Sequence, residues 1–287
     1  MPELPEVETI RRDLCKKIIG KKITVVEIRE KKIAKPDSRT LIKTLLGNKF
    51  TAIERIGKLL IFHLKRKNFF LLAHLKLTGQ LVYCPLATPQ KFTPLNSCEA
   101  NLTRFTRTII YFNDQSRLYF NDLRKFGWLK IADKTEKEKI IKESFGPDAI
   151  SKDFNYPYFK NRLVSRKKSR IKAVLLDQRI TAGIGNIYAD ESLFAAGLKP
   201  SRKAGSLKDA EIKKLFAAVK KILKKAIKRR GTSISDYVDG QGQPGNFSEY
   251  LKVYQREGKK CLRCKKGIIK KIYDSGRGTR FCDYCQK

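Results

Sequence analysis

Apolar residues near the start of the chain recur at helical spacing. Between residues 5 and 19 they fall three or four positions apart, and Gly20 follows as a stop signal; the series is Val7, Ile10, Leu14 and Ile18. This periodicity predicts one amphipathic helix. Pro5 suits the first turn of a helix, where the positive end of the dipole also favours the glutamates of the opening MPELPEVE. Helix punctuation does not explain Pro2.

The pattern changes between residues 22 and 131 to short runs of β-branched and aromatic residues. Six runs carry this composition: ITVVEI, LLIFHL, FFLLAHL, RTIIYF, RLYF and GWLKI. Runs of this kind predict the strands of a sandwich or a barrel. Residues 86–100 contain prolines and little periodicity, so we expect a long surface loop there.

Helical periodicity dominates the second half of the chain. The charged residues 133–155 predict a short helix that leads into a linker, and we place the domain boundary there. Helices are predicted at 171–176 and 188–196, and an amphipathic helix with a lysine-rich outer face at 211–230. Residues 233–247 have four glycines or prolines within six positions and no apolar period, which predicts a mobile loop.

The net charge points to a polyanionic partner. The 287 residues include 64 Lys and Arg against 28 Asp and Glu, a formal charge of +36 that is spread through every segment. Nucleic acid is the leading explanation; a lysine-rich proteome would account for part of the excess, and a membrane surface is the weaker competitor. No apolar run approaches the ~20 residues of a membrane span, and no signal peptide opens the chain. We therefore expect a cytoplasmic protein with no membrane partner.

Four of the seven cysteines have the spacing of a metal site. Seventeen residues separate one CxxC pair from the other; the ligands would be Cys261, Cys264, Cys282 and Cys285. Four thiolates suit a tetrahedral zinc ion and leave no position open for catalysis, so one structural Zn²⁺ is predicted rather than a redox dithiol. The intervening sequence predicts a β-hairpin that presents Arg277 at its tip, where it could bind phosphate or the minor groove.

A glycine-rich turn precedes one of the predicted helices. In TAGIGNIYADESLFAAG, backbone amides at the turn could bind a DNA phosphate. A plain helix cap is the alternative, because the motif is weak by itself. The residues therefore leave both readings open.

Several stretches together resemble a known family. MPELPEVE, RIGKLLIF around Lys58, DLRKFGW, GIGNIYADESLFAAG and the terminal RGTRFCDYCQ occur in an order that resembles the formamidopyrimidine-DNA glycosylases, bacterial base-excision repair enzymes. The resemblance spans essentially the whole chain. It implies a multidomain α+β protein: an N-terminal β-sandwich with an N-terminal helix, a helix-two-turns-helix domain and a C-terminal zinc finger built as a β-hairpin ribbon. We place these domains at 1–132, 156–250 and 251–287, with a linker at 133–155 and a lesion lid at 233–247.

The resemblance implies a role for the unexplained Pro2. Removal of Met1 would expose its secondary amine, which is less basic than a lysine and can act as a nucleophile. Attack on C1′ of a damaged nucleotide would expel the base, here an oxidised purine, and leave a Schiff base. Glu3 would protonate the sugar ring oxygen and shuttle the proton of the amine. The abasic strand would then be cleaved by β- and δ-elimination.

Other residues match DNA-contacting positions of the family. The resemblance implies that Lys58 assists elimination and that Arg124 and Phe126 enter the duplex once the lesion is flipped. Leu77 falls at the third void-filling position, and the expected phosphate ligands are Lys167, Asn186 and Arg277, with Arg277 also counted in the catalytic set. We expect damaged double-stranded DNA as the partner, no nucleotide cofactor and a monomer. If the protein contacts six or more phosphates, its affinity for DNA should fall by ~10³ or more when the salt concentration rises from 50 to 200 mM.

Three positions depart from the family's pattern. Leu77 stands where Met is usual, Phe105 where a DNA-contacting His is common, and Leu123 where Pro usually precedes the arginine. These departures concern the approach to the lesion rather than the reaction.

Two other functions compete with an oxidised-purine glycosylase. The endonuclease VIII branch, which prefers oxidised pyrimidines, usually has Gly at the position of Leu4. A zinc-ribbon DNA-binding protein without catalysis would not need Pro2, Glu3 and Lys58. Borohydride trapping on lesion-containing DNA would separate catalysis from binding alone.

Overall fold

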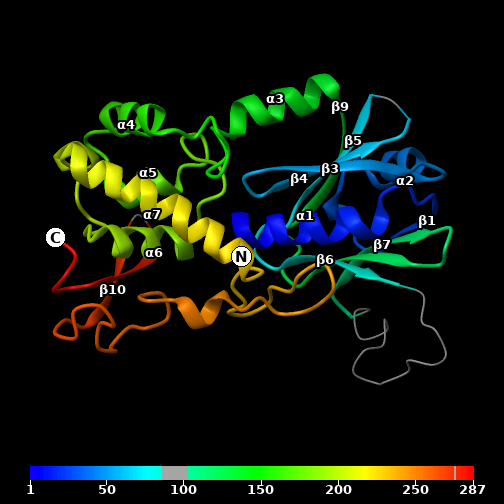
Figure 1. The fold of residues 1–287 in the computed structure, drawn as a ribbon. Helices are drawn as coiled ribbons and strands as arrows, with labels where there is room; N and C mark the ends of the chain where they lie inside the picture. Colours follow the sequence, from blue (N-terminus) through cyan, green and yellow to red (C-terminus); the bar gives the residue numbers. More distant parts are fainter. Residues whose placement is uncertain (67, 86–102, 275) are drawn as a thin grey trace. The chain divides into compact units, whose positions relative to one another are not determined.

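The computed structural model describes residues 1–66, 68–85, 103–274 and 276–287. The predicted loop at 86–100 lies outside the described residues. The chain divides into two compact units: one comprises Met1–Ile141 with Arg229–Asn246, and the other Lys142–Lys228 with Phe247–Lys287 (Figure 1). Each unit is described by itself.

The first unit begins with the predicted amphipathic helix. Helix α1 spans Leu4–Ile18, and the residues on its apolar stripe, Val7, Ile10, Leu14 and Ile18, are fully buried. Gly20 follows with a φ of 81°, a backbone conformation that suits glycine. The periodicity of the sequence therefore predicted both the helix and its buried face.

Two sheets make up the rest of this unit. The five-stranded sheet has the order β2 (Ala34–Lys35), β9 (Trp128–Asp133), β5 (Phe69–His74), β4 (Leu59–Leu64) and β3 (Phe50–Ile56). The four-stranded sheet has the order β1 (Ile23–Ile28), β7 (Thr106–Phe112), β8 (Arg117–Asp122) and β6 (Gly79–Cys84). Neighbours are antiparallel except β2 and β9, which are parallel.

A single apolar core joins both sheets and helix α1. The ring of Phe50 lies 5.2 Å from that of Phe62 in the same sheet and 6.4 Å from that of Phe112 in the other sheet. The same cluster includes Tyr237, from the segment 229–246. This arrangement confirms the predicted β-sandwich. The six predicted runs all form strands, whereas β2, β3, β6 and helix α2 (Ser38–Leu45) were not predicted.

The second unit is largely helical. It contains α4 (Tyr156–Ser165), α5 (Ile171–Leu176), α6 (Asn186–Ala196) and α7 (Asp209–Lys228), and 3-10 helices at Ala204–Ser206 and Phe247–Tyr250. Apolar residues of α7 at helical spacing are buried, among them Ile212, Leu215, Val219 and Leu223. Helix α3 (Lys134–Ser144) occupies the predicted linker, and the division between the units falls within it.

The chain ends in the predicted hairpin. Strands β10 (Ile269–Asp274) and β11 (Arg277–Cys282) are antiparallel, with Asp274 opposite Arg277. Among the described residues, no helix is both long and apolar enough to cross a lipid bilayer.

Candidate active site and DNA-binding surfaces

Glu3, directly after Pro2, is held in place by a capping box at the start of α1. Both residues are buried, and the backbone N–H of Glu3, the N-cap, donates to Oε2 of Glu6 at 2.8 Å. The Glu3 side chain in turn accepts from the backbone N–H of Glu6. Reciprocal bonds of this kind satisfy donors that a helix start leaves open. The first turn therefore has one defined geometry next to Pro2.

The second oxygen of Glu6 ties this turn to a distant segment. Its Oε1 accepts from the backbone N–H of Thr232 at 2.8 Å, so one buried carboxylate holds both chain segments. The neighbouring Gly231 has a φ of 81°, and a Cβ there would lie 2.8 Å from Oε1 of Glu6. Glycine is needed at this position both for its conformation and for its lack of a side chain.

Two ion pairs of Arg230 hold the start of the predicted lid. Arg230 donates to the carboxylates of Asp13 on α1 and Asp239, and the backbone N–H of Gly240 also donates to Asp13. Asp239 is 1 % exposed and accepts from two backbone N–H groups of its own loop. The segment lacks regular secondary structure, as predicted, but these contacts attach it to the first unit.

A third carboxylate of α1, that of Glu8, is connected to the turn that carries Lys58. Glu8 accepts from Arg55 at 3.0 Å, and Arg55 also donates to the carbonyl of Gly57 at 2.9 Å. Burial raises the pKa of Glu8, but bonds from Arg11, Arg12 and Arg55 outweigh it and lower that pKa to about 2. The charged pair thus links the first helix to the residue preceding Lys58.

The surroundings of buried Lys58 keep a nearby histidine neutral. Burial, followed by the positive charges of Lys76 and Lys58, lowers the pKa of His74 to about 3. Nδ1 of His74 accepts from the backbone N–H of Lys76 at 3.0 Å, which requires this nitrogen to be unprotonated. His74 therefore contributes packing and a hydrogen-bond acceptor rather than charge.

Asp122 shapes the loop that presents Arg124 and Phe126. This carboxylate is completely buried and accepts from the backbone N–H groups of Arg124 and Gly127 at 3.2 and 2.7 Å. The loop directs both side chains outward, with the guanidinium carbon of Arg124 5.0 Å from the ring centroid of Phe126. The Phe126 side chain is 53 % exposed, so it is not a core residue of this unit.

A basic pocket of about 490 Å³ adjoins this loop. Its lining combines four lysines with apolar side chains: Lys32, Lys35, Lys76, Lys125, Leu77, Phe126, Gly127 and Trp128. Leu77, at the third void-filling position of the family, and Phe126, which is expected to enter the duplex, thus share one pocket. Positive charge beside exposed apolar groups suits the phosphates and stacked bases of DNA.

The second unit brings Asn186 together with the turn of Arg277. Asn186 begins α6 after Gly185, and its Nδ2 donates to the carbonyl of Gly278 at 2.9 Å. Arg277, directly before Gly278, is exposed. Lys167 is also exposed, in the turn after α4, and its carbonyl accepts from the N–H of Gly205. All three predicted phosphate ligands therefore belong to one unit.

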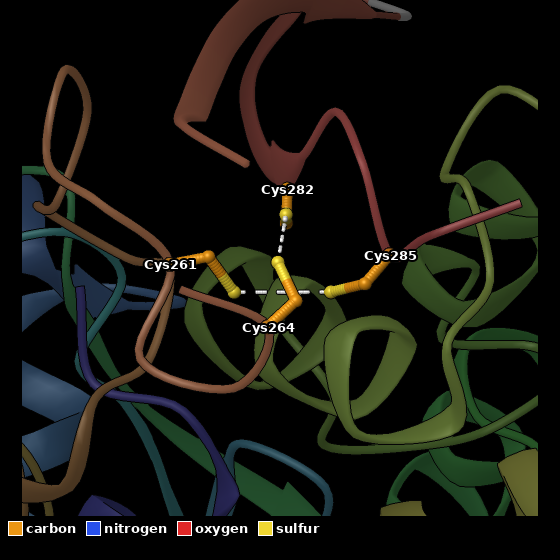
Figure 2. Close-up of side chains that lie close together, drawn as sticks. All are labelled: Cys261, Cys264, Cys282 and Cys285. Atoms are coloured by element: carbon orange, nitrogen blue, oxygen red, sulfur yellow. Dashed lines mark hydrogen bonds between the residues drawn. The ribbon is translucent and has the colours of Figure 1, made fainter. Parts of the chain in front are cut away.

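The four predicted metal ligands converge (Figure 2). The sulfur atoms of Cys261 and Cys285 are 3.8 Å apart, and those of Cys264 and Cys282 are 3.7 Å apart. A tetrahedron with Zn–S bonds of about 2.3 Å places its sulfurs about 3.8 Å from one another. A Cβ on Gly267 would lie 2.6 Å from the sulfur of Cys282, so only glycine fits there. The residues present therefore fit a tetrahedral metal ion.

Comparison with known families assigns most of the chain. Residues 1–129 match the formamidopyrimidine-DNA glycosylase N-terminal domain, and residues 145–238 match the formamidopyrimidine-DNA glycosylase H2TH domain. The chain belongs to the formamidopyrimidine-DNA glycosylase family. The resemblance inferred from the sequence motifs is thereby confirmed.

Individual glycosylases of this family match over the full length. The chain is 42 % identical to the formamidopyrimidine-DNA glycosylase of Carboxydothermus hydrogenoformans over 288 residues, covering 100 % of both. A Lactococcus lactis Fpg mutant in complex with DNA containing Fapy-dG is 34 % identical and has a TM-score of 0.88, with both chains covered completely. The wild-type Lactococcus lactis Fpg in complex with DNA containing an oxidised pyrimidine matches with a TM-score of 0.86 at the same identity and coverage.

Several residues that shape the candidate site in one unit or the other were not singled out from the sequence. Glu6 and Glu8 were interpreted only as helix-dipole residues, although each makes specific bonds. Asp122 and Lys172 were not considered at all. The repeated acidic residues of MPELPEVE are the signal that could have identified the first two, whereas nothing in the local sequence distinguishes a buried Lys172 from a solvated lysine.

Proposed function

We propose that this protein excises oxidised purines from duplex DNA and then cleaves the abasic strand. The observation that carries the proposal is the pair of buried residues Pro2 and Glu3, of which Glu3 is fixed by the capping box of α1. The bridge through Glu8 and Arg55 to the turn of Lys58 supports it.

In the first step Pro2 acts as the nucleophile. While Met1 is attached, the nitrogen of Pro2 is a tertiary amide without a usable lone pair, so Met1 must be removed. The resulting amine attacks C1′, the bond from C1′ to the base breaks, and the departing base takes up a proton from water. Glu3 donates a proton to the ring oxygen as the sugar opens and takes up the proton lost by the amine, which leaves an iminium between Pro2 and C1′.

The iminium then permits the lyase steps. It acidifies the C2′ proton, whose loss expels the 3′ phosphate in a β-elimination; a second elimination expels the 5′ phosphate. Lys58 assists these eliminations, and Arg277 contributes to the catalytic set through the phosphate that it binds. Water then hydrolyses the iminium and regenerates the amine.

Base flipping needs groups that replace the extruded nucleotide. Phe126 wedges the stack, Arg124 pairs with the orphaned cytosine, and Leu77 fills the remaining space. Lys167, Asn186 and Arg277 hold phosphates around the lesion. The exposure of Arg124 and Phe126 above the buried Asp122 supports their role in the duplex.

The four cysteines would hold one structural Zn²⁺. Such an ion contributes folding energy to the hairpin and takes no part in the reaction. Metal analysis of the purified protein should find about one zinc per chain, and Cys261→Ser should lower this content. Retention of full zinc by a variant that lacks two of the four cysteines would contradict the assignment.

Borohydride trapping tests the enzyme directly. With duplex DNA containing 8-oxoguanine, reduction of the iminium should link protein and DNA covalently, and mass spectrometry should show Met1 removed. Pro2→Gly should abolish the covalent band, and an N-terminal extension should do the same, while a C-terminal extension should not. Wild-type yields from Pro2→Gly would overturn the proposal.

Oxidised pyrimidines are a second candidate substrate class. The wild-type Lactococcus lactis Fpg, 34 % identical to this chain, forms a complex with DNA containing an oxidised pyrimidine. Trapping rates on matched purine and pyrimidine lesion duplexes should therefore be compared. A faster rate with the pyrimidine lesion would assign the protein to the alternative substrate class while keeping the chemistry.

A further inference from the structure

A buried lysine reaches the turn that carries Arg277. Lys172, on α5, is 1 % exposed, and its ammonium group donates to Oγ1 of Thr279 at 2.7 Å and to the carbonyl of Gly278 at 3.3 Å. It also forms an ion pair with Asp190 of α6 at 2.7 Å. The ammonium therefore contacts both α6 and the start of β11.

Asp190 continues the connection to the same strand. Its second oxygen accepts from the backbone N–H of Arg280 at 2.9 Å, and Asp190 is completely buried. Thr279, which accepts from Lys172, donates through its hydroxyl to the carbonyl of Arg277 at 3.1 Å. Bonds from two helices therefore fix the backbone of residues 277–280.

A buried ion pair is a poor device for stability alone. Desolvation raises the pKa of Asp190 and lowers that of Lys172, and the opposite charge of each partner opposes these shifts. Similar pairs can often be replaced by apolar groups without loss of stability, and in some proteins they restrict the fold to one arrangement. In this protein the bonds of the pair restrict the backbone at the start of β11, where the exposed Arg277 lies at the end of the hairpin.

We propose that Lys172 and Asp190 are positioning residues that hold Arg277 and Asn186 in register for one DNA phosphate. Asn186 and Lys172 donate to the same carbonyl of Gly278. The positions of both side chains are therefore set relative to one backbone group. The pair acts through the turn and does not touch DNA itself. The inference rests on the proposed function, because it presupposes that Arg277 binds a phosphate.

The test is the salt dependence of binding to duplex DNA with a tetrahydrofuran abasic analogue. Arg277→Ala should lower the slope of log K against log salt by about 0.9, the loss of one phosphate contact, and weaken binding about tenfold or more. Lys172→Met should reproduce the slope change, and the double variant should show no further change. Lys220→Met serves as the control, since Lys220 is partly buried in the same unit and donates to the carbonyl of Ser151.

Zinc content and borohydride trapping distinguish a misfolded variant, a wrong positioning role and a wrong proposed function. Lys172→Met should keep the wild-type zinc content; if that variant does not fold, Thr279→Val, which removes only the hydroxyl link, should still lower the slope. A wild-type slope in Lys172→Met, or a slope loss that adds to that of Arg277→Ala, overturns the positioning role. Borohydride trapping of the wild-type protein, carried out in parallel, tests the proposed chemistry independently. If no covalent band forms, the proposed function has failed, whatever the salt dependence shows.

Discussion

Glu6 and Thr232 are separated by 226 positions and joined by one hydrogen bond of 2.8 Å, from the backbone N–H of Thr232 to the Glu6 carboxylate. The other oxygen of Glu6 accepts from the backbone N–H of Glu3. The start of the first helix and the segment after α7 therefore share one buried acceptor, which places the candidate nucleophile and the predicted lid in the same unit.

Glu6→Gln should destabilise this unit by about 1–3 kcal/mol, because the amide NH₂ of Gln would face one of two buried N–H donors. Urea unfolding followed by the fluorescence of Trp128, the only tryptophan and a residue of β9, measures this unit. The exposed Glu138→Gln is the matched control. Equal unfolding midpoints in the two variants would mean that the shared acceptor carries no stability.

Gly231→Ala should cost more stability than Gly20→Ala. Both glycines have a φ of 81°, so alanine suffers the same conformational penalty of about 1–2 kcal/mol at each. A Cβ at Gly20 meets no atom within 4 Å, whereas one at Gly231 would contact the Glu6 carboxylate, which adds about 1–3 kcal/mol of overpacking. The measurement is again urea unfolding. Indistinguishable midpoints for the two variants would show that the Glu6 side chain can move away from the added Cβ without a cost in stability.

The Glu8 carboxylate should contribute stability that disappears in acid. Its pKa is about 2 in the folded protein against an ordinary value of 4.5, so the contribution is present above pH 4.5 and is lost as the pH falls toward 2. Glu8→Gln should therefore have a lower urea midpoint than the wild type at pH 6, and this difference should shrink below pH 4.5. A difference that stays constant down to pH 2.5 would contradict the assigned role of the three arginines.

Phe126→Ala should slow trapping on lesion DNA by about tenfold while leaving the urea midpoint unchanged. Stacking of an aromatic group on a base contributes about 1–3 kcal/mol, whereas a half-exposed ring contributes little to the core. Leu46→Ala, at another exposed apolar side chain, is the control. A large drop in stability with Phe126→Ala would identify the ring as a packing residue instead.

The cluster of four cysteines illustrates what a sequence can predict from spacing. A CxxC pair brings two thiolates together locally, and a hairpin between the pairs brings one pair to the other. Cys261 and Cys282 could therefore be predicted to lie in one cluster from the sequence alone. The same holds for α1, whose apolar spacing defines its buried face, and for the strand runs. In each case the decisive interactions are either local in the chain or repeat with a short period.

Helix α1, most of the strands, the cluster of four cysteines and the family all follow from the sequence alone. The folded chain was needed to show that Glu6 bonds Thr232, that Arg55 links Glu8 to the turn of Lys58, and that Lys172 is buried against Asp190 and Thr279. These contacts join residues far apart in the chain, and a charged side chain has the same local pattern whether it is solvated or buried. Its partner, and hence its role, exists only once the chain has folded.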